Sequence, residues 1–197
     1  AYDKGSIEVF GKPMKPDSYD LKRNIGVVFQ NVAVFDTLTV QENIDYFCGL
    51  YIKDKKLRRQ YVAEAVEFAG LSDFVKFYPK KLSGGLLRRL NIACGIAHKP
   101  KLILLDEHTA ALEPKTAAKV LEITEMIVNR DHLTTMMITH NMQDAITHGN
   151  RLIMMMEGKI ILDIQGEEKK KLTVKNLLDQ FEKASGEEFS NDSALLG

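Results

Sequence analysis

The feature that most constrains the fold is the stretch Lys81–Pro114, where a glycine-containing helix start precedes a short apolar strand. In the first half, Ser83 is a good N-cap residue, and Gly84 and Gly85 let the backbone approach a ligand closely. A helix N-terminus presents free N–H groups and the positive end of the helix dipole, which suit an anionic oxygen. The first half therefore predicts a helix start that faces a phosphate.

The second half of the stretch, Leu102–Glu107, is an apolar run that ends in Asp106 and Glu107. A buried parallel strand delivers such acids to the carboxyl edge of its sheet. There one carboxylate can hold Mg²⁺ and the other can orient or polarise a water. Each half alone has a simpler interpretation, because Ser-Gly-Gly is often a turn and Asp-Glu is often a solvated strand end. The two halves in this order favour a site that handles phosphate.

The order and spacing of these residues resemble the ATP-binding cassette (ABC) family, in which a Leu-Ser-Gly-Gly signature precedes a Walker B strand. The resemblance extends from Gln30, which is similar to the glutamine of the Q-loop, to His140, which is similar to the switch-loop histidine. It implies an α/β fold of the P-loop NTPase type with a mostly parallel sheet core. A helical lobe is expected over about residues 40–98, together with a small β region at the N-terminus.

The resemblance also implies a role for each of these positions. Asp106 is expected to hold Mg²⁺, and Glu107 is expected to act as the general base or to orient the attacking water. Gln30 would contact Mg²⁺ and the water, and His140 would stabilise the γ-phosphate as charge develops. A further group would bind the ATP held by a second cassette subunit, and its members are Ser83, Gly84 and Gly85.

The family's phosphate-binding loop, Gly-x-x-x-x-Gly-Lys-Ser/Thr, does not occur in these residues. Gly11-Lys12 fails as a candidate because Pro13 stands where Ser or Thr should bind Mg²⁺, so a turn is expected there. Since that loop supplies most of the phosphate affinity, we expect an ABC ATPase domain incomplete at its N-terminus that binds ATP weakly and hydrolyses little. The missing strand is expected next to the Walker B strand, and its absence should leave apolar faces and an unpaired edge exposed.

The resemblance implies partners as well as a site. A transmembrane permease subunit and a second ABC ATPase subunit, in a homo- or heterodimer, are expected at the inner face of the cell membrane, on the cytoplasmic side. Residues up to about 105 resemble ATPases paired with ABC-2-type export permeases. From Asp106 onward the chain resembles ATPases of amino-acid-type uptake systems. The transported substrate and the direction of transport therefore stay open.

Composition excludes several other classes. Lysine plus arginine equals aspartate plus glutamate at 27 each, so no overall field recruits nucleic acid, and no nucleic-acid partner is expected. No apolar run approaches the roughly 20 residues needed to span a bilayer, so a soluble chain is expected. Cys48 and Cys94 lie in apolar, helix-like contexts without metal-type spacing, which predicts buried free thiols.

The expected organisation is a truncated ABC ATPase domain over residues 1–165, followed over 166–197 by a charged linker, a short helix and a polar tail. Within the first part, Thr134–Thr139 is expected to form a buried strand, and Glu157-Gly158 predicts a hairpin turn. Two alternatives to a transporter ATPase stay open. One is a non-catalytic ABC-type interaction module. The other is a soluble ABC ATPase acting on DNA or ribosomes, although no tandem cassette, coiled-coil insertion or basic linker points to it.

Overall fold

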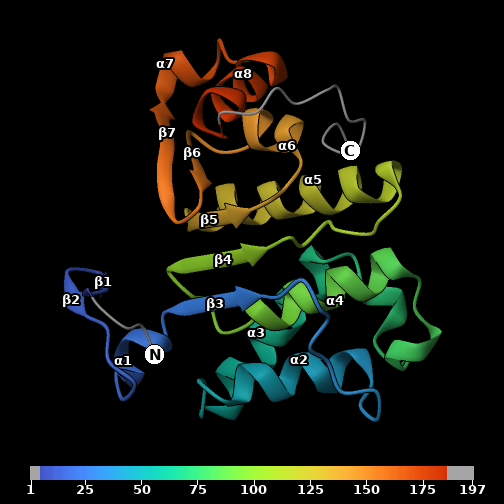
Figure 1. The fold of residues 1–197 in the computed structure, drawn as a ribbon. Helices are drawn as coiled ribbons and strands as arrows, with labels where there is room; N and C mark the ends of the chain where they lie inside the picture. Colours follow the sequence, from blue (N-terminus) through green and yellow to red (C-terminus); the bar gives the residue numbers. More distant parts are fainter. Residues whose placement is uncertain (1–4, 186–197) are drawn as a thin grey trace. The chain divides into compact units, whose positions relative to one another are not determined.

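The chain forms two compact units that divide after Ile138 in the computed structural model, which describes residues 5–185 (Figure 1). The division falls earlier than the boundary expected after residue 165. The functional assignment of residues 1–165 to one domain stays a prediction.

The first unit opens with a small hairpin. Strands β1 (Glu8–Val9) and β2 (Lys12–Pro13) pair antiparallel. Phe10 and Gly11 form the turn between them, with φ of 54° and 70°. The expectation of a turn at Gly11, instead of a phosphate loop, is therefore confirmed. The short helix α1 (Tyr19–Lys22) then leads into the first strand of the main sheet.

The main sheet has three parallel strands, β3 (Ile25–Val28), β4 (Leu102–Asp106) and β5 (Thr134–Ile138), in the order β3-β4-β5. The central strand β4 is the apolar run that ends in the two carboxylates. Because β4 already has a partner on each side, the expectation that a missing strand lies next to it is wrong. The outer edges of this sheet belong to β3 and β5.

One face of the sheet is covered by helices α4 (Gly84–Ile96) and α5 (Pro114–Asp131). Register places Val27 and Met136 in one row on the other face, and these side chains are 37% and 57% exposed. The expected exposure of an apolar face is thus confirmed, but the prediction of a buried strand at Thr134–Thr139 is wrong, because β5 lies at an edge. The covered face holds an apolar cluster of Val28, Ile92, Ile96, Ile103, Leu105, Val120, Ile123 and Ile127.

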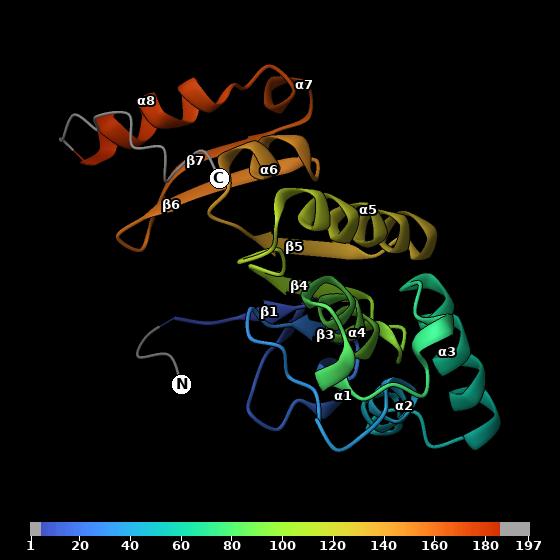
Figure 2. The same cartoon turned by 90° about the vertical axis from the view of Figure 1, so that its right-hand side faces the viewer.

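The helical lobe is confirmed, and it consists of α2 (Val40–Gly49), α3 (Lys55–Phe68) and two short 3₁₀ helices, η1 (Ser72–Phe74) and η2 (Pro79–Lys81), which lead into α4. Figure 2 shows α2 and α3 beside α4. Thr39 and Glu42 form the capping box that starts α2.

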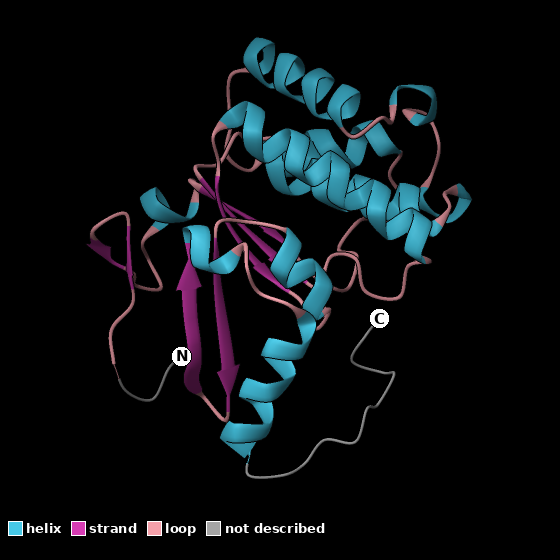
Figure 3. Ribbon diagram, turned by 90° about the horizontal axis from the view of Figure 1, so that it is seen from above, coloured by secondary structure: helices cyan, strands magenta, loops and turns pink. Residues whose placement is uncertain are grey.

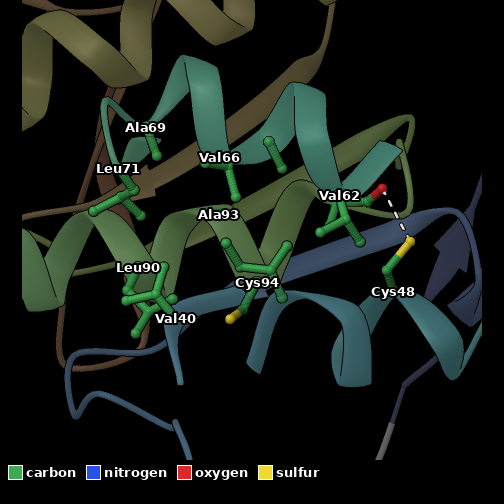
Figure 4. Packing of buried hydrophobic residues seen from close by; sticks show 12 residues of the cluster. Val40, Cys48, Val62, Val66, Ala69, Leu71, Leu90, Ala93 and Cys94 are labelled. Carbon is green, nitrogen blue, oxygen red and sulfur yellow. Dashed lines mark hydrogen bonds between the residues drawn. The ribbon is translucent and has the colours of Figure 1, made fainter. Parts of the chain in front are cut away.

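The interior of the lobe is apolar and contains both cysteines, which are free and buried as predicted. Figure 4 shows this packing, with the Cys48 thiol donating to the carbonyl of Ala97 at 3.4 Å. The buried members from α2, α3 and α4 include Val40, Ile44, Cys48, Val62, Val66, Leu90, Ala93 and Cys94. Helix α4 therefore belongs both to the lobe and to the layer that covers the sheet.

The second unit contains α6 (Met142–Thr147), β6 (Arg151–Met156), β7 (Lys159–Gln165), α7 (Gly166–Lys169) and α8 (Val174–Ser185). Strands β6 and β7 pair antiparallel, and Figure 3 shows them as neighbouring strands. Glu157 and Gly158 turn the hairpin with φ of 48° and 75°, which confirms that prediction.

The expected charged linker at 166–171 is only partly a linker, because Gly166–Lys169 forms α7. Lys169 is 3% exposed and donates to the carbonyl oxygens of His148 (2.8 Å), Gly149 (3.2 Å) and Ile146. Its ammonium thereby satisfies carbonyls at and just beyond the end of α6. The short helix is confirmed as α8, and the polar tail lies outside the described residues.

Candidate functional site

Two of the predicted site residues meet at the carboxyl edge of the parallel sheet. Gln30 follows β3 by two residues, Asp106 ends β4, and Glu107 is the next residue. Because β3 and β4 are parallel neighbours, these ends lie side by side. The Gln30 Nε2 group donates a hydrogen bond of 2.9 Å to Glu107 Oε2. The structure thus joins a polar residue of one strand end to the carboxylate of the next.

Glu107 has an unusual backbone. Its φ of 43° lies in the left-handed region, which non-glycine residues adopt at a cost. The Glu107 N–H donates to the carbonyl of Ile138 at 3.0 Å, and the Glu107 carbonyl accepts from the N–H of Ala110 at 2.9 Å. These two bonds stabilise the turn that ends β4. The strained residue is the one expected to act as general base, and backbone strain of this kind concentrates at functional sites.

The signature segment forms the start of α4, as predicted. Ser83 is the N-cap, and its Oγ accepts from the N–H of Leu86 at 3.4 Å. Ser83 and Gly84 are exposed, so a ligand can approach them from solvent. Gly85 also has a packing reason to be glycine, because an added Cβ would lie 2.5 Å from Thr116 Cγ2 on α5.

Helix α4 also forms hydrogen bonds to the segment that carries Gln30, and these contacts were not predicted from the sequence. Arg88 Nη1 donates to the carbonyls of Phe29 (3.0 Å) and Gln30 (2.6 Å). Asn91 Nδ2 donates to the same Phe29 carbonyl at 3.1 Å, and Asn91 Oδ1 accepts from the N–H of Ala33 at 3.3 Å. The available signal was the spacing of Arg88 and Asn91 in a largely apolar helix, since residues three positions apart lie on one face.

His140 belongs to the second unit, where it is exposed and lies just before Asn141, the N-cap of α6. Its expected approach to the γ-phosphate therefore stays a prediction. Asn141 itself caps α6 by accepting from the N–H of Asp144 at 2.9 Å. The chain near His140 is thus ordered by a helix start that the sequence analysis did not single out.

The donor set at the sheet edge is compatible with Mg²⁺. Within residues 5–185, no three His, Cys, Asp or Glu side chains gather as a metal-holding group. Mg²⁺ in nucleotide sites is commonly held by one or two carboxylates together with substrate phosphates, so Asp106 needs no such cluster. Because Gln30 Nε2 donates to Glu107, the amide oxygen is the atom of Gln30 that a cation would use.

His108, which follows the carboxylate pair, is buried against α5. It is 1% exposed, and its Nε2 lies 3.3 Å from Thr124 Oγ1 on α5. Since the Thr124 hydroxyl donates to the carbonyl of Val120 at 2.9 Å, it accepts from His108, which assigns the ring proton to Nε2. This burial and contact favour a packing role for His108. Pro114 begins α5.

A parallel sheet with acids at its carboxyl edge, covered by helices and joined to a helical lobe, defines a nucleotide-handling α/β domain of the P-loop NTPase class. Comparison with solved structures agrees. The ATP-binding cassette MJ0796, solved as a dimer in a post-hydrolysis state with ADP and Pi, matches with a TM-score of 0.71 and 27% identity, over 83% of this chain and 74% of that one. CbiO1 from Clostridium perfringens, part of the ABC transporter complex CbiONQ, matches with a TM-score of 0.78 over 92% of this chain and 73% of that one. At 22% identity, this second likeness shows the fold alone.

Sequence comparison is more specific. The profile of the ABC transporter family matches residues 1–110. A tyrosine transport ATP-binding protein of Clostridioides difficile is 35% identical over 176 residues, covering 84% of this chain and 70% of that protein. A methionine import ATP-binding protein of Corynebacterium glutamicum is 37% identical over 141 residues, covering 72% of this chain and 39% of that protein. The chain belongs to the ABC transporter family, and it spans less than half the length of its methionine import relatives.

These results confirm the family and the fold class inferred from the sequence. The relatives named for amino-acid transport align over more than the part from Asp106 onward, so the resemblance to uptake ATPases is confirmed and extends further toward the N-terminus than expected. Within residues 5–185, no helix combines the length and apolarity required to cross a bilayer.

Proposed function

We propose that this chain is part of the ATP-hydrolysing subunit of an ABC transporter that imports an amino acid through a membrane permease. The observation that carries the proposal is the hydrogen bond from Gln30 to Glu107, which joins two predicted site residues at the carboxyl edge of the sheet. Import of an amino acid is supported by relatives whose names specify tyrosine transport and methionine import.

In this proposal each site residue at the sheet edge has its own role. Glu107 accepts a proton from the attacking water, or orients that water, through the carboxylate that Gln30 now contacts. Asp106 holds Mg²⁺, which when bound neutralises charge on the phosphates. Gln30 orients the water and offers its amide oxygen to the cation. Since Nε2 donates to Glu107, that oxygen can meet the cation while the bond to Glu107 is kept.

Other parts of the chain serve partners. The exposed N-terminus of α4, with Ser83, Gly84 and Gly85, binds the ATP of a second cassette subunit by backbone N–H groups and the Ser83 hydroxyl. The dimeric state of MJ0796 supports such pairing. His140 stabilises the γ-phosphate, and the helical lobe transmits closure to the permease. The name of a relative that is an ATP-binding protein for methionine import supports a membrane partner.

The absence of a Gly-x-x-x-x-Gly-Lys-Ser/Thr loop from these residues limits what they do alone. Without that nest of N–H groups and its lysine, the edge of β3 and β4 lacks the main source of phosphate affinity. We therefore propose that the 197-residue chain is close to inactive by itself and that a P-loop supplied ahead of it restores hydrolysis.

A titration with a fluorescent Mg-ATP analogue tests this proposal. The 197-residue chain is compared with a longer version that carries a P-loop segment ahead of residue 1. We expect tight binding and hydrolysis only in the longer version, and Glu107→Gln should abolish hydrolysis there while leaving binding intact. Micromolar binding by the short chain would show that the phosphate site has been placed wrongly. Unchanged hydrolysis by the Glu107→Gln variant would remove Glu107 from its role.

A further inference from the structure

We propose that Arg88 and Asn91 are positioning residues that hold the segment Phe29–Ala33, so that the side chain of Gln30 reaches Glu107. They also tie this segment to the helix that starts at the signature residue Ser83. The catalytic meaning of this inference rests on the proposed function. Its structural part is independent of ATP, because it concerns how one segment of backbone is held.

The segment needs such support because it lies beyond the last ladder pair of β3. Pairing with β4 ends at Val28 and Leu105, so the next carbonyls, those of Phe29 and Gln30, have no strand partner in that ladder. Main-chain polar groups in a partly buried place require hydrogen-bond partners. Arg88 supplies them to both carbonyls, at 3.0 and 2.6 Å.

Arg88 is buried where it makes this contact. Its side chain is only 7% exposed, and its Nε has no hydrogen-bond partner among the described residues. Burial also lowers the pKa of this guanidinium. Burying a guanidinium with one N–H group unpaired costs folding free energy. This cost argues that the contact is more than an incidental surface interaction. Both bonds come from Nη1, and the Nζ of a lysine, which lies one bond nearer the backbone, would not reach the same position.

Asn91 holds the same segment from one helical turn further along. It donates to the carbonyl of Phe29 at 3.1 Å and accepts from the N–H of Ala33 at 3.3 Å, so it bonds to the backbone on both sides of Gln30. Asn91 is 5% exposed. Four hydrogen bonds from two residues of α4 therefore fix the backbone from which the Gln30 side chain projects.

The support is stiff because α4 is itself packed tightly against β3. A Cβ added at Gly95 would lie 2.9 Å from Val28 Cγ2, and one added at Gly26 would lie 2.4 Å from the Gly95 carbonyl oxygen. The helix and the strand thus touch without intervening side chains. A shift of the N-terminal end of α4, where Ser83 would meet the ATP of a partner subunit, would therefore be transmitted to the backbone of Gln30.

The neighbouring residue Arg89 provides a matched control. It lies on the same helix, and burial lowers the pKa of its guanidinium as well. Its Nη1, however, lies 3.4 Å from the carbonyl of Gly70 in the helical lobe, away from the Gln30 segment. A lysine at position 88 and a lysine at position 89 are the same chemical change at adjacent sites.

The first experiment uses the 197-residue chain without nucleotide. Side-chain amide resonances of Gln30 and backbone amide exchange at Ala33 are measured by NMR in Arg88→Lys, Asn91→Ala and Arg89→Lys. We expect the Gln30 resonances to shift in the Arg88 and Asn91 variants toward the positions they take in Glu107→Gln. We also expect exchange at Ala33 to quicken about tenfold or more, whereas Arg89→Lys leaves both unchanged. Arg88→Lys spectra that match those of Arg89→Lys would overturn the proposal.

The second experiment uses the longer, P-loop-bearing version. Arg88→Lys should lower kcat about 10- to 100-fold with little change in the KM for ATP, since misplacing a catalytic group by about 1 Å has effects of that size. Arg89→Lys should change neither constant. A rise in the KM for ATP with kcat unchanged would contradict a positioning role. If no version hydrolyses ATP, the proposed function fails, and the NMR comparison still decides whether Arg88 and Asn91 position Gln30.

Discussion

Replacement of Gly26 by alanine tests whether the direct contact of β3 with α4 holds the site together. Gly26 is buried in β3, and an added Cβ would lie 2.4 Å from the carbonyl oxygen of Gly95 and 2.9 Å from Pro100 Cγ. The carbonyl is a backbone atom, so no side-chain rotation relieves the clash. Strand and helix would have to separate by roughly 1 Å to restore ordinary contact.

The expected cost lies at the upper end of the range for overpacking, about 3 kcal/mol, because the whole helix must move and not one side chain. For a domain of this size, that loss corresponds to a fall in melting temperature of about 6–12 °C. Gly84→Ala is the matched control. Its added Cβ would have Leu112 Cδ2 as nearest atom at 3.7 Å, an ordinary contact, and alanine is a better helix former than glycine.

The assay is thermal and urea unfolding followed by far-UV circular dichroism, since the chain has no tryptophan. We expect Gly26→Ala to unfold at a clearly lower temperature and urea concentration, and Gly84→Ala to unfold at the same values as the parent or higher. Equal stability of Gly26→Ala and the parent would refute the claim that backbone contact between β3 and α4 fixes the distance from Gln30 to the signature helix.

Three further predictions concern single groups. Hydrogen bonds from the backbone N–H and hydroxyl of Thr39 lower the pKa of Glu42, so its stabilising effect should be present above pH 4.5 and lost as the pH falls below that value. Glu42→Gln should therefore flatten the dependence of the urea midpoint on pH below about 4.5. Burial raises the pKa of Cys48 to about 11 and also raises that of Cys94, so an aromatic disulfide reagent at pH 8 should react with either thiol only as the chain unfolds. Lys169→Met should destabilise the second unit by about 2 kcal/mol, because carbonyls near the end of α6 lose their donor, and faster amide exchange confined to that unit would show it.

Local patterns in the sequence were enough to predict several elements of the fold. Ser83 starts a helix as its N-cap, and the Glu157-Gly158 turn joins two strands. Each of these features depends on interactions within a few residues, so the chain near it carries all the information needed. The family resemblance added the order of the functional positions, but it did not give their contacts.

Features that depend on distant neighbours were harder to predict. The Thr134–Thr139 segment has a strand pattern, but its burial depends on whether a further strand lies beside it, and β5 proved to be at an edge. Lys169 looked like part of a charged linker, because its three carbonyl partners come from a segment some twenty residues earlier. Arg88 and Asn91 were missed for the same reason, since their partners lie about sixty residues away.

The central position of β4 explains why the carboxylate site depends on both neighbouring strands. On one side, β3 leads to Gln30, whose amide contacts the Glu107 carboxylate. On the other side, β5 ends at Ile138, whose carbonyl accepts the Glu107 N–H and helps hold its left-handed backbone. The β3 side therefore holds the side chain of Glu107, and the β5 side holds its main chain. A change at the edge of β5 should alter the direction in which the Glu107 side chain projects. A change in the contacts between α4 and the segment after β3 should alter only what the Glu107 carboxylate contacts.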